Sequence, residues 1–139
     1  MSKLLNISEA ATIAIHSLAL IAYEGRQLNA NEISKLTAFS KNHLSKVLQT
    51  LVKQGYLSSV RGPRGGFTLT VDASKLTLLE IFEVFEGKIL NNYCHGHYNN
   101  CLFENCIFGD IIDDVTVQFK KAFGERTLAD VRMKRNEAE

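Results

Sequence analysis

Three cysteines, the only ones in this chain of 139 residues, lie within thirteen residues of one another. They are Cys94, Cys101 and Cys106, and two histidines, His95 and His97, stand between the first pair. Three thiols cannot all pair as disulfides within one chain. Clustered thiolates with nearby imidazoles are ligands that suit zinc or an iron–sulfur cluster. The segment therefore predicts a metal centre.

A second group of candidate residues is polar or basic and lies in the first half of the chain. Residues 41–54 carry an apolar stripe at helical spacing, and the positions outside it are hydrogen-bonding types that suit base edges and phosphates in a major groove. The candidate DNA-binding residues on this stretch and directly before it are Ser40, Lys41, Asn42, His43, Lys46 and Gln49. Arg61 and Arg64 follow on an expected wing with a glycine-rich turn, and guanidinium groups are suited to a minor groove. Both sets predict binding to double-stranded DNA.

The charge of the chain is divided unequally, although the net charge is only +1. Residues 1–75 carry nine Lys or Arg against four Asp or Glu, a net charge of +5. Residues 76–139 carry seven Lys or Arg against eleven Asp or Glu, a net charge of −4. A basic region attracts a polyanion and an acidic region is repelled by it. We therefore expect the first half to contact DNA.

The first expected helix precedes both candidate sites. Asn6 followed by Glu9 is typical of a capping box, which predicts that Asn6 caps a helix running to about Tyr23. Apolar residues recur along this stretch at three- and four-residue spacing, so we expect a deeply packed helix. Gly25 is expected to end it.

Two further helices are predicted with a tight turn between them. Asn29 with Glu32 is a second capping-box pattern, for a short helix that ends near Thr37. Ser40 is expected to cap the next helix, over residues 41–54. Two short helices joined in this way form a helix-turn-helix.

Residues 56–71 predict a β-hairpin directly after the helix-turn-helix. Two alternating runs, 56–61 and 67–71, flank a turn at 62–66 that contains glycines and the single proline of the chain. A hairpin in this position is a wing, and it carries both candidate arginines, Arg61 at the end of the first run and Arg64 in the turn.

The remaining helices are expected on either side of the cysteines. Thr77 with Glu80 is a capping-box pattern for a helix to about Glu86, and a short last helix is expected to begin at Thr127. Residues 107–123 form a helix with an apolar stripe that should not face water, so we expect it to bury against a second copy of the chain. The stripe includes Ile111, Ile112, Val115, Phe119 and Phe123.

These elements predict a mainly α fold with a small β-hairpin wing, that is, a winged helix-turn-helix followed by a long C-terminal dimerisation helix. The expected parts are a DNA-binding domain (1–87), a cysteine-rich loop (88–106) and a dimerisation helix with a C-terminal tail (107–139). No catalytic constellation is present, so we do not expect an enzyme. The sequence predicts neither a signal peptide nor a membrane span, so we expect a cytoplasmic protein without membrane association.

The stretches Asn42–Leu51, Gly55–Tyr56 and Arg61–Gly66 resemble the Rrf-two (Rrf2) family of bacterial winged-helix transcription regulators, and the similarity extends to Thr127–Asp130. Members of that family include an iron–sulfur cluster regulator and a nitric-oxide-sensitive repressor. The resemblance implies a homodimer in which a long C-terminal helix crosses onto the partner. A two-fold dimer is expected to bind a pseudo-palindromic operator.

The resemblance also implies an iron–sulfur cluster on three cysteines, which are Cys94, Cys101 and Cys106 in this chain. Six residues separate the first pair and four the second, where five and five are more usual in the family. The total span is similar, and we expect a 2Fe–2S rather than a 4Fe–4S cluster. The implied function is a repressor rather than an activator, controlled by redox state, nitric oxide or iron–sulfur status.

Three cysteines leave a fourth ligand to be found. One branch of the family uses a histidine three residues after the last cysteine, where this chain has Gly109. Another branch uses an acidic residue near the start of the first helix of the other subunit, a region that Glu9 occupies here. Glu9 is otherwise a first-turn carboxylate favoured by the helix dipole. His97 or His95 is an alternative ligand, and His16 is expected to pack against its surroundings instead.

Three other functions remain open from the sequence. Structural zinc on the three cysteines and His97 is one, since three thiolates and one imidazole make a closed zinc site. A cysteine-based redox enzyme is another, and it would turn over a disulfide or peroxide substrate. A protein-binding winged helix is the third, and it would not depend on Lys41 or Arg61. An iron–sulfur protein is coloured and a zinc protein is not, so anaerobic absorption spectroscopy distinguishes the iron–sulfur cluster from structural zinc.

Overall fold

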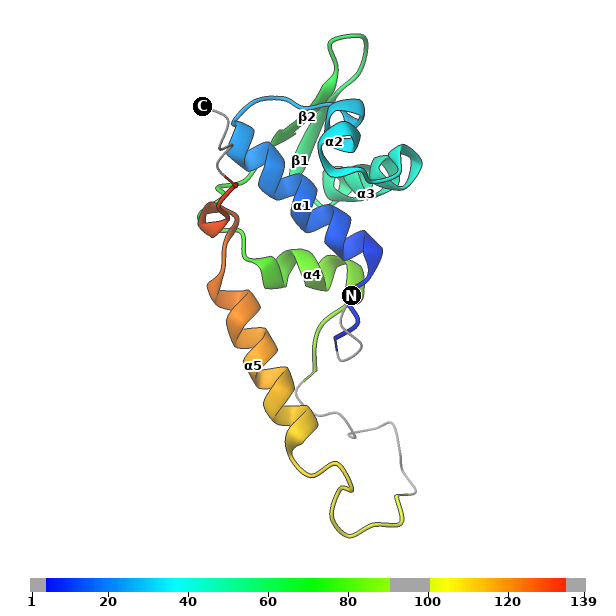
Figure 1. Ribbon diagram of the computed structural model, residues 1–139, viewed down its shortest axis with the longest axis vertical. Helices are drawn as coiled ribbons and strands as arrows, with labels where there is room; N and C mark the ends of the chain where they lie inside the picture. The colour runs from blue at the N-terminus through cyan, green and yellow to red at the C-terminus, as the bar shows by residue number, and fades with distance from the viewer. Residues whose placement is uncertain (1–4, 91–100, 135–139) are drawn as a thin grey trace.

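A computed structural model describes residues 5–90 and 101–134, and over these ranges it contains five α-helices, one two-stranded hairpin and a short 3-10 helix (Figure 1). The elements are α1 (Glu9–Glu24), α2 (Ala30–Thr37), α3 (Lys41–Lys53), β1 (Leu57–Val60), β2 (Gly66–Leu69), α4 (Leu78–Glu86), α5 (Ile111–Glu125) and η1 (Leu128–Asp130). This mainly α arrangement with a hairpin wing confirms the expected fold class.

Helix α1 lies at the centre of the winged domain. In Figure 1 it passes between the α2–α3 pair on one side and α4 on the other. Its fully buried Leu18 belongs to one core cluster with Leu48 of α3 and Ile81 of α4. Burying a side chain of this size contributes about 1.5–3 kcal/mol. The helix that carries the candidate ligand Glu9 is therefore fixed to both of its neighbours.

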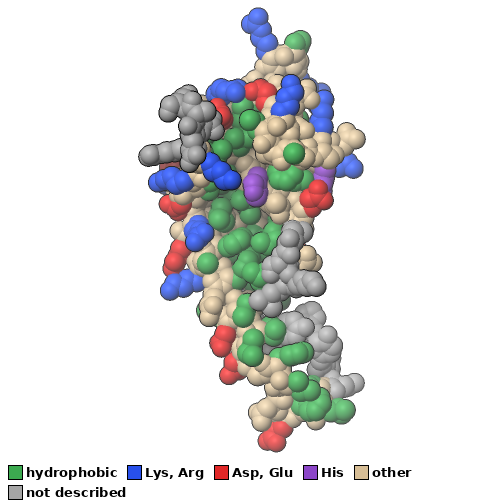
Figure 2. Space-filling model, in the orientation of Figure 1, with side chains coloured by type: hydrophobic (Ala, Val, Ile, Leu, Met, Phe, Trp, Pro, Cys, Tyr) green, Lys and Arg blue, Asp and Glu red, His purple; other side chains and the backbone are tan. Residues whose placement is uncertain are grey.

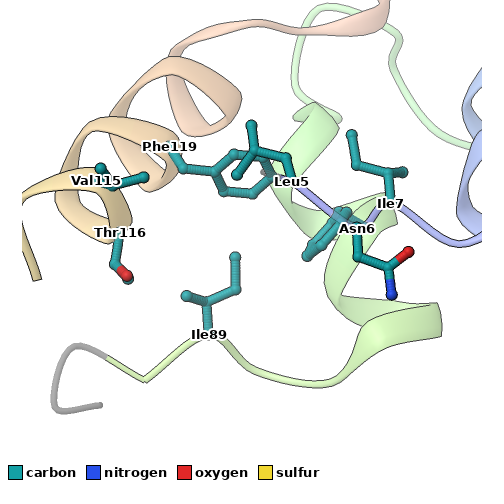
Figure 3. A pocket seen from close by; sticks show the side chains of 8 residues that line it. Leu5, Asn6, Ile7, Ile89, Val115, Thr116 and Phe119 are labelled. Atoms are coloured by element: carbon teal, nitrogen blue, oxygen red, sulfur yellow. The ribbon is translucent and has the colours of Figure 1, made fainter. Parts of the chain in front are cut away.

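The start of α1 differs from the sequence-based prediction, which made Asn6 the N-cap. Ser8 is the cap instead, and its Oγ accepts a hydrogen bond from the backbone N–H of Ala11 at 3.1 Å. Asn6 precedes the helix and lines an apolar hollow of about 170 Å³ between the N-terminal segment, α4 and α5 (Figure 3). An N-cap side chain accepts from an N–H two or three residues ahead of it. Residues 5–7 line the hollow instead of extending α1, so the helix begins at Glu9 and Ser8 stands in the capping position.

The wing is a short antiparallel hairpin whose paired residues run from Leu57 with Leu69 to Val60 with Gly66. It is fastened to the segment between α1 and α2. The N–H of Leu28 donates to the carbonyl of Phe67 at 3.1 Å, and the N–H of Phe67 donates back at 2.7 Å. This pair of bonds holds the wing against the winged domain.

Helix α5 begins at Ile111 rather than at residue 107, because the chain first makes a turn in which the N–H of Gly109 donates to the carbonyl of Cys106 at 2.9 Å. Gly109 has a φ of 59°, a left-handed conformation that glycine adopts without strain. Helix α5 contacts α4 through Phe119 and Phe123, whose rings lie 5.1 Å and 5.9 Å from the ring of Phe82. None of its described residues is fully buried.

After α5 the chain returns to the winged domain. Leu128 is only 3% exposed and belongs to the same core cluster as α1 and α3. Two backbone bonds fix this return: the N–H of Leu78 donates to the carbonyl of Arg126 at 2.9 Å, and that of Leu128 donates to Leu76 at 3.1 Å. In the described ranges no helix is both long and apolar enough to cross a membrane.

Candidate nucleic-acid interface and cysteine segment

Helix α3 has one buried side and one outward side. The buried side consists of Leu44, Val47, Leu48 and Leu51. The outward side carries residues that the sequence predicts to contact DNA. His43 is half-buried, and the others are exposed: Lys41, Asn42, Lys46 and Gln49. The fold therefore brings the predicted contacts together on one face of a helix that stands at the surface, as a major-groove helix must.

The turn before α3 is held by bonds of its own. The N–H of Ala38, at a left-handed φ of 62°, donates to the carbonyl of Ser34 at 2.8 Å. The hydroxyl of Ser34 donates to the carbonyl of Phe39 at 2.8 Å. Ser40 stands in the N-cap position of α3, but its hydroxyl forms no capping bond, which corrects the prediction of a side-chain cap there. Its side chain is exposed, and the helix begins without that bond.

The two candidate arginines lie in the exposed loop that joins β1 and β2. The side-chain amide of Gln27 donates to the backbone carbonyl of Arg64 at 2.6 Å, which ties the loop to the end of α1. A Cβ on Gly65 would overlap the carbonyl oxygen of Val60. The close packing of this backbone explains the glycine and fixes the shape of the tip that carries the arginines.

Lys and Arg side chains are visible at the tip of the wing and around the α2–α3 end of the molecule, while Asp and Glu side chains stand at the far end, near the start of α5 (Figure 2). The arrangement follows the division of charge along the sequence, +5 in residues 1–75 and −4 in residues 76–139. A phosphate backbone is attracted to the first surface and repelled by the second.

The cysteine segment lies only partly within the described residues. Cys94, His95 and His97 fall outside them. Cys101 and Cys106 are exposed free thiols in the stretch before α5, and this stretch lies at the opposite end of the molecule from the wing (Figure 1). Over the described ranges, no three His, Cys, Asp or Glu side chains lie close enough together to hold a metal ion.

The other candidate ligands lie on α1. Glu9 is the first residue of the helix, and its side chain is 65% exposed. Its Oε1 lies 3.3 Å from Nδ1 of His43 on α3. His16 is exposed, and its Nδ1 lies 2.7 Å from the carbonyl oxygen of Thr12 while its ring meets Phe39 edge-on at 5.8 Å. These contacts connect α1 with the helix-turn-helix.

A comparison with known protein families identifies the chain. The family model described as Rrf2, iron-dependent transcriptional regulator, matches residues 7–134. The chain belongs to the Rrf2 family.

Curated relatives of this Rrf2 protein are described as HTH-type transcriptional regulators. One from Aquifex aeolicus is 37% identical over 128 residues, which cover 89% of each chain. Another, BadM of Rhodopseudomonas palustris, is 42% identical over 69 residues. That match covers 50% of this chain and 44% of BadM, so the present chain matches less than half of the length of that relative.

Solved structures share the Rrf2 fold with this chain. CymR, described as the global cysteine regulator of B. subtilis, matches with a TM-score of 0.70 and 19% identity over 91% of this chain and 95% of CymR. IscR of T. potens matches with a TM-score of 0.71 and 20% identity over 91% of this chain and 85% of IscR. At these identities the likeness establishes the fold, and Rrf2 membership establishes a DNA-binding transcriptional regulator.

Two contacts of this Rrf2 protein were not anticipated from the sequence. One is the pair between Glu9 and His43. The other joins the backbone N–H of Ser8 to Oε1 of Glu86, 78 residues later, at 3.0 Å. No local pattern signals either contact, because each depends on how separate helices pack.

Proposed function

We propose that the protein is a homodimeric transcriptional repressor whose binding to a pseudo-palindromic operator is controlled by an iron–sulfur cluster. The observation that carries the cluster is the presence of three cysteines within thirteen residues, two of them exposed free thiols just before α5. The iron-dependent description of the family supports the same interpretation. The outward polar face of α3 and the arginines of the wing support operator binding.

The donor set fits such a cluster, because thiolates are its usual ligands. Cys94, Cys101 and Cys106 would hold it, as a 2Fe–2S rather than a 4Fe–4S cluster. When bound, the cluster supplies a centre that oxygen, nitric oxide or a shortage of iron can alter. The exposure of Cys101 and Cys106 leaves that centre within reach of small molecules in solution.

Glu9 of the other subunit is the proposed fourth ligand, and His97 is the alternative. The exposure of the Glu9 carboxylate suits an intersubunit role. Zinc on the three cysteines and His97 is the second candidate, favoured by the histidines inside the cysteine segment. CymR, described as a cysteine regulator, has the same fold, so this fold is compatible with more than one kind of signal.

We propose that three parts of the chain divide the work, with DNA binding in residues 1–87, cluster binding in 88–106 and dimerisation in 107–139. The dimer is supported by the apolar side chains that α5 leaves in water, of which Ile111 is 67% and Val117 54% exposed. Exposed apolar surface of this kind is typical of an interface between protein chains.

Anaerobic purification with absorption spectroscopy and iron, sulfide and zinc analysis tests the cluster. We expect coloured wild-type protein with iron and sulfide, and a colourless Cys101→Ala variant that still folds and whose DNA affinity does not respond to nitric oxide or oxygen. Colourless wild-type protein with zinc would support the second candidate. Equal operator affinity for the variant and the intact holo-protein, on every duplex tried, would contradict control by the segment.

Operator binding is tested separately with the wing. Arg61→Ala is expected to weaken binding by about 1–3 kcal/mol if its guanidinium lies in a groove. Arg132→Ala is the matched control, since this exposed arginine lies in the acidic second half of the chain and should leave affinity unchanged. Fluorescence anisotropy at matched salt measures both, and equal affinities for the two variants would remove the wing from the interface.

A further inference from the structure

The first turn of α3 is in contact with the first turn of α1. Nδ1 of His43 lies 3.3 Å from Oε1 of Glu9, at the end of α3 that a recognition helix inserts into DNA. The His43 side chain is 36% exposed, so part of the ring remains accessible. With Nδ1 occupied by the carboxylate, Nε2 is the ring nitrogen that can face a base or a phosphate.

The position of Glu9 is itself fixed by its neighbours. The hydroxyl of Ser8, next to it, caps α1 through the N–H of Ala11. The N–H of Ser8 donates to Oε1 of Glu86 at 3.0 Å. Glu86 is the last residue of α4 and directly precedes the stretch that leads to the cysteines. A continuous set of contacts therefore joins the end of α4 to the DNA-reading face of α3.

We propose that Glu9 is a positioning residue for DNA reading, because its carboxylate holds the imidazole of His43 in the orientation that contacts the operator. Glu86 fixes the N-terminal end of α1, where Glu9 lies. The inference rests on the proposed operator binding through α3. It assigns the Glu9 carboxylate a role within its own subunit, toward the recognition helix, whatever metal the cysteines hold.

The sign of the effect distinguishes this role from a simple charge effect. Glu9 is an exposed carboxylate beside a surface that meets phosphates, so its charge alone opposes DNA binding. Removing only a repulsive charge raises affinity, whereas releasing His43 lowers it. Exposed ion pairs contribute up to about 1 kcal/mol, which converts to a loss of roughly three- to fivefold in affinity.

A double-mutant cycle tests the pair on the full-length protein under anaerobic conditions. The probe is a fluorescent duplex that the wild-type protein selects from random-sequence DNA. We expect the loss of affinity caused by Glu9→Ala to be about three- to fivefold larger when His43 is present than in a His43→Ala background, whatever effect the lost charge or a lost ligand has in both. Glu9→Gln retains an acceptor for Nδ1 and is expected to bind nearly as well as the wild type.

Two substitutions of His43 separate its contacts. His43→Asn places an amide N–H near the position of Nδ1 and keeps the bond to Glu9 without reaching DNA. His43→Gln extends to the position of Nε2 but leaves Glu9 without its partner. We expect this additional loss from Glu9→Ala to be absent in both backgrounds, since each lacks half of the connection. Glu86→Ala should weaken binding in the wild type by a smaller factor and have no effect in His43→Ala.

The outcomes are distinct from those that test the proposed function. An equal loss from Glu9→Ala in the wild-type and His43→Ala backgrounds, or a gain in affinity from Glu9→Ala, would overturn the positioning role. Iron analysis of each variant reports whether Glu9 also acts as a ligand, because a ligand role changes iron content regardless of His43. A wild-type protein that selects no duplex would refute operator binding itself and, with it, the positioning role that rests on it.

Discussion

The winged domain and helix α5 use apolar residues in opposite ways. In the winged domain, Leu18, Leu48 and Ile81 are fully buried in one core. In α5 the described side chains include none that is fully buried, and Ile111 at its start is 67% exposed. Both regions are helical, so the contrast does not come from secondary structure. It comes from the number of neighbouring elements, since α1 is packed on several sides and α5 on one.

The difference shows which surfaces the single chain completes and which it leaves open. A single helix is stabilised in water mainly by packing of its apolar face. The contact of Phe119 and Phe123 with Phe82 covers only one part of α5. The other apolar residues near its start need a further surface, for which we proposed a second copy of the chain.

The largest effect is expected where the tail joins the core. Leu128→Ala should lower the free energy of unfolding by about 2–5 kcal/mol, because it leaves a cavity in a close-packed cluster. Met133→Ala, a few residues later and 42% exposed, should have a much smaller effect. Urea unfolding followed by circular dichroism measures both. Similar losses for the two variants would mean that the tail does not belong to the winged domain.

A charge on the open side of α5 should prevent dimerisation. Ile111→Asp places a carboxylate in the proposed interface and is expected to raise the dimer dissociation constant at least about a hundredfold, equivalent to about 2.7 kcal/mol. Leu36→Asp is the matched control, because Leu36 of α2 is similarly exposed, at 61%, but lies in the winged domain. Sedimentation velocity reports the oligomeric state, and an Ile111→Asp protein that remains a tight dimer would exclude this part of α5 from the interface.

A smaller effect should distinguish the starts of α4 and α5. The hydroxyl of Thr77 accepts from the N–H of Glu80 at 3.1 Å, whereas Asp110, at the start of α5, makes no side-chain cap. Thr77→Ala should therefore cost about 1 kcal/mol of stability. Asp110→Ala should cost less, since no capping bond is lost. Thermal unfolding compares the two, and the reverse order would show that α5 depends on its start more than the winged domain depends on α4.

The smallest effect is expected on the stability of the fold at acidic pH. The pKa of Asp130 is lowered because its carboxylate accepts two hydrogen bonds from Thr127. The bond from the backbone N–H is the larger cause, and the bond from the hydroxyl is the second. A lowered folded pKa gives stability that is present above the ordinary aspartate pKa and lost as the pH falls toward the folded value. We expect Asp130→Asn to make the free energy of unfolding less sensitive to pH in that acidic window. An unchanged pH dependence would count against this bond in solution.

Local patterns in the sequence predicted most of the winged domain. The capping box of Asn29 and Glu32 is present with both of its bonds, and Gly25 ends α1 in a left-handed conformation. The apolar stripe of α3 is buried, so its polar side faces outward as expected. These features depend on residues a few positions apart, where helical geometry alone decides which groups meet.

Long-range packing decided the remaining features. Because of this packing, Ser8 rather than Asn6 caps α1, Leu128 lies in the core, and Glu9 contacts His43. Residue types and spacing determined that this chain is a winged-helix regulator with a thiol-rich segment. The contact that joins the first turn of α1 to the reading helix required the tertiary structure, because it is a matter of where separate helices come to lie, and each helix could form without the other.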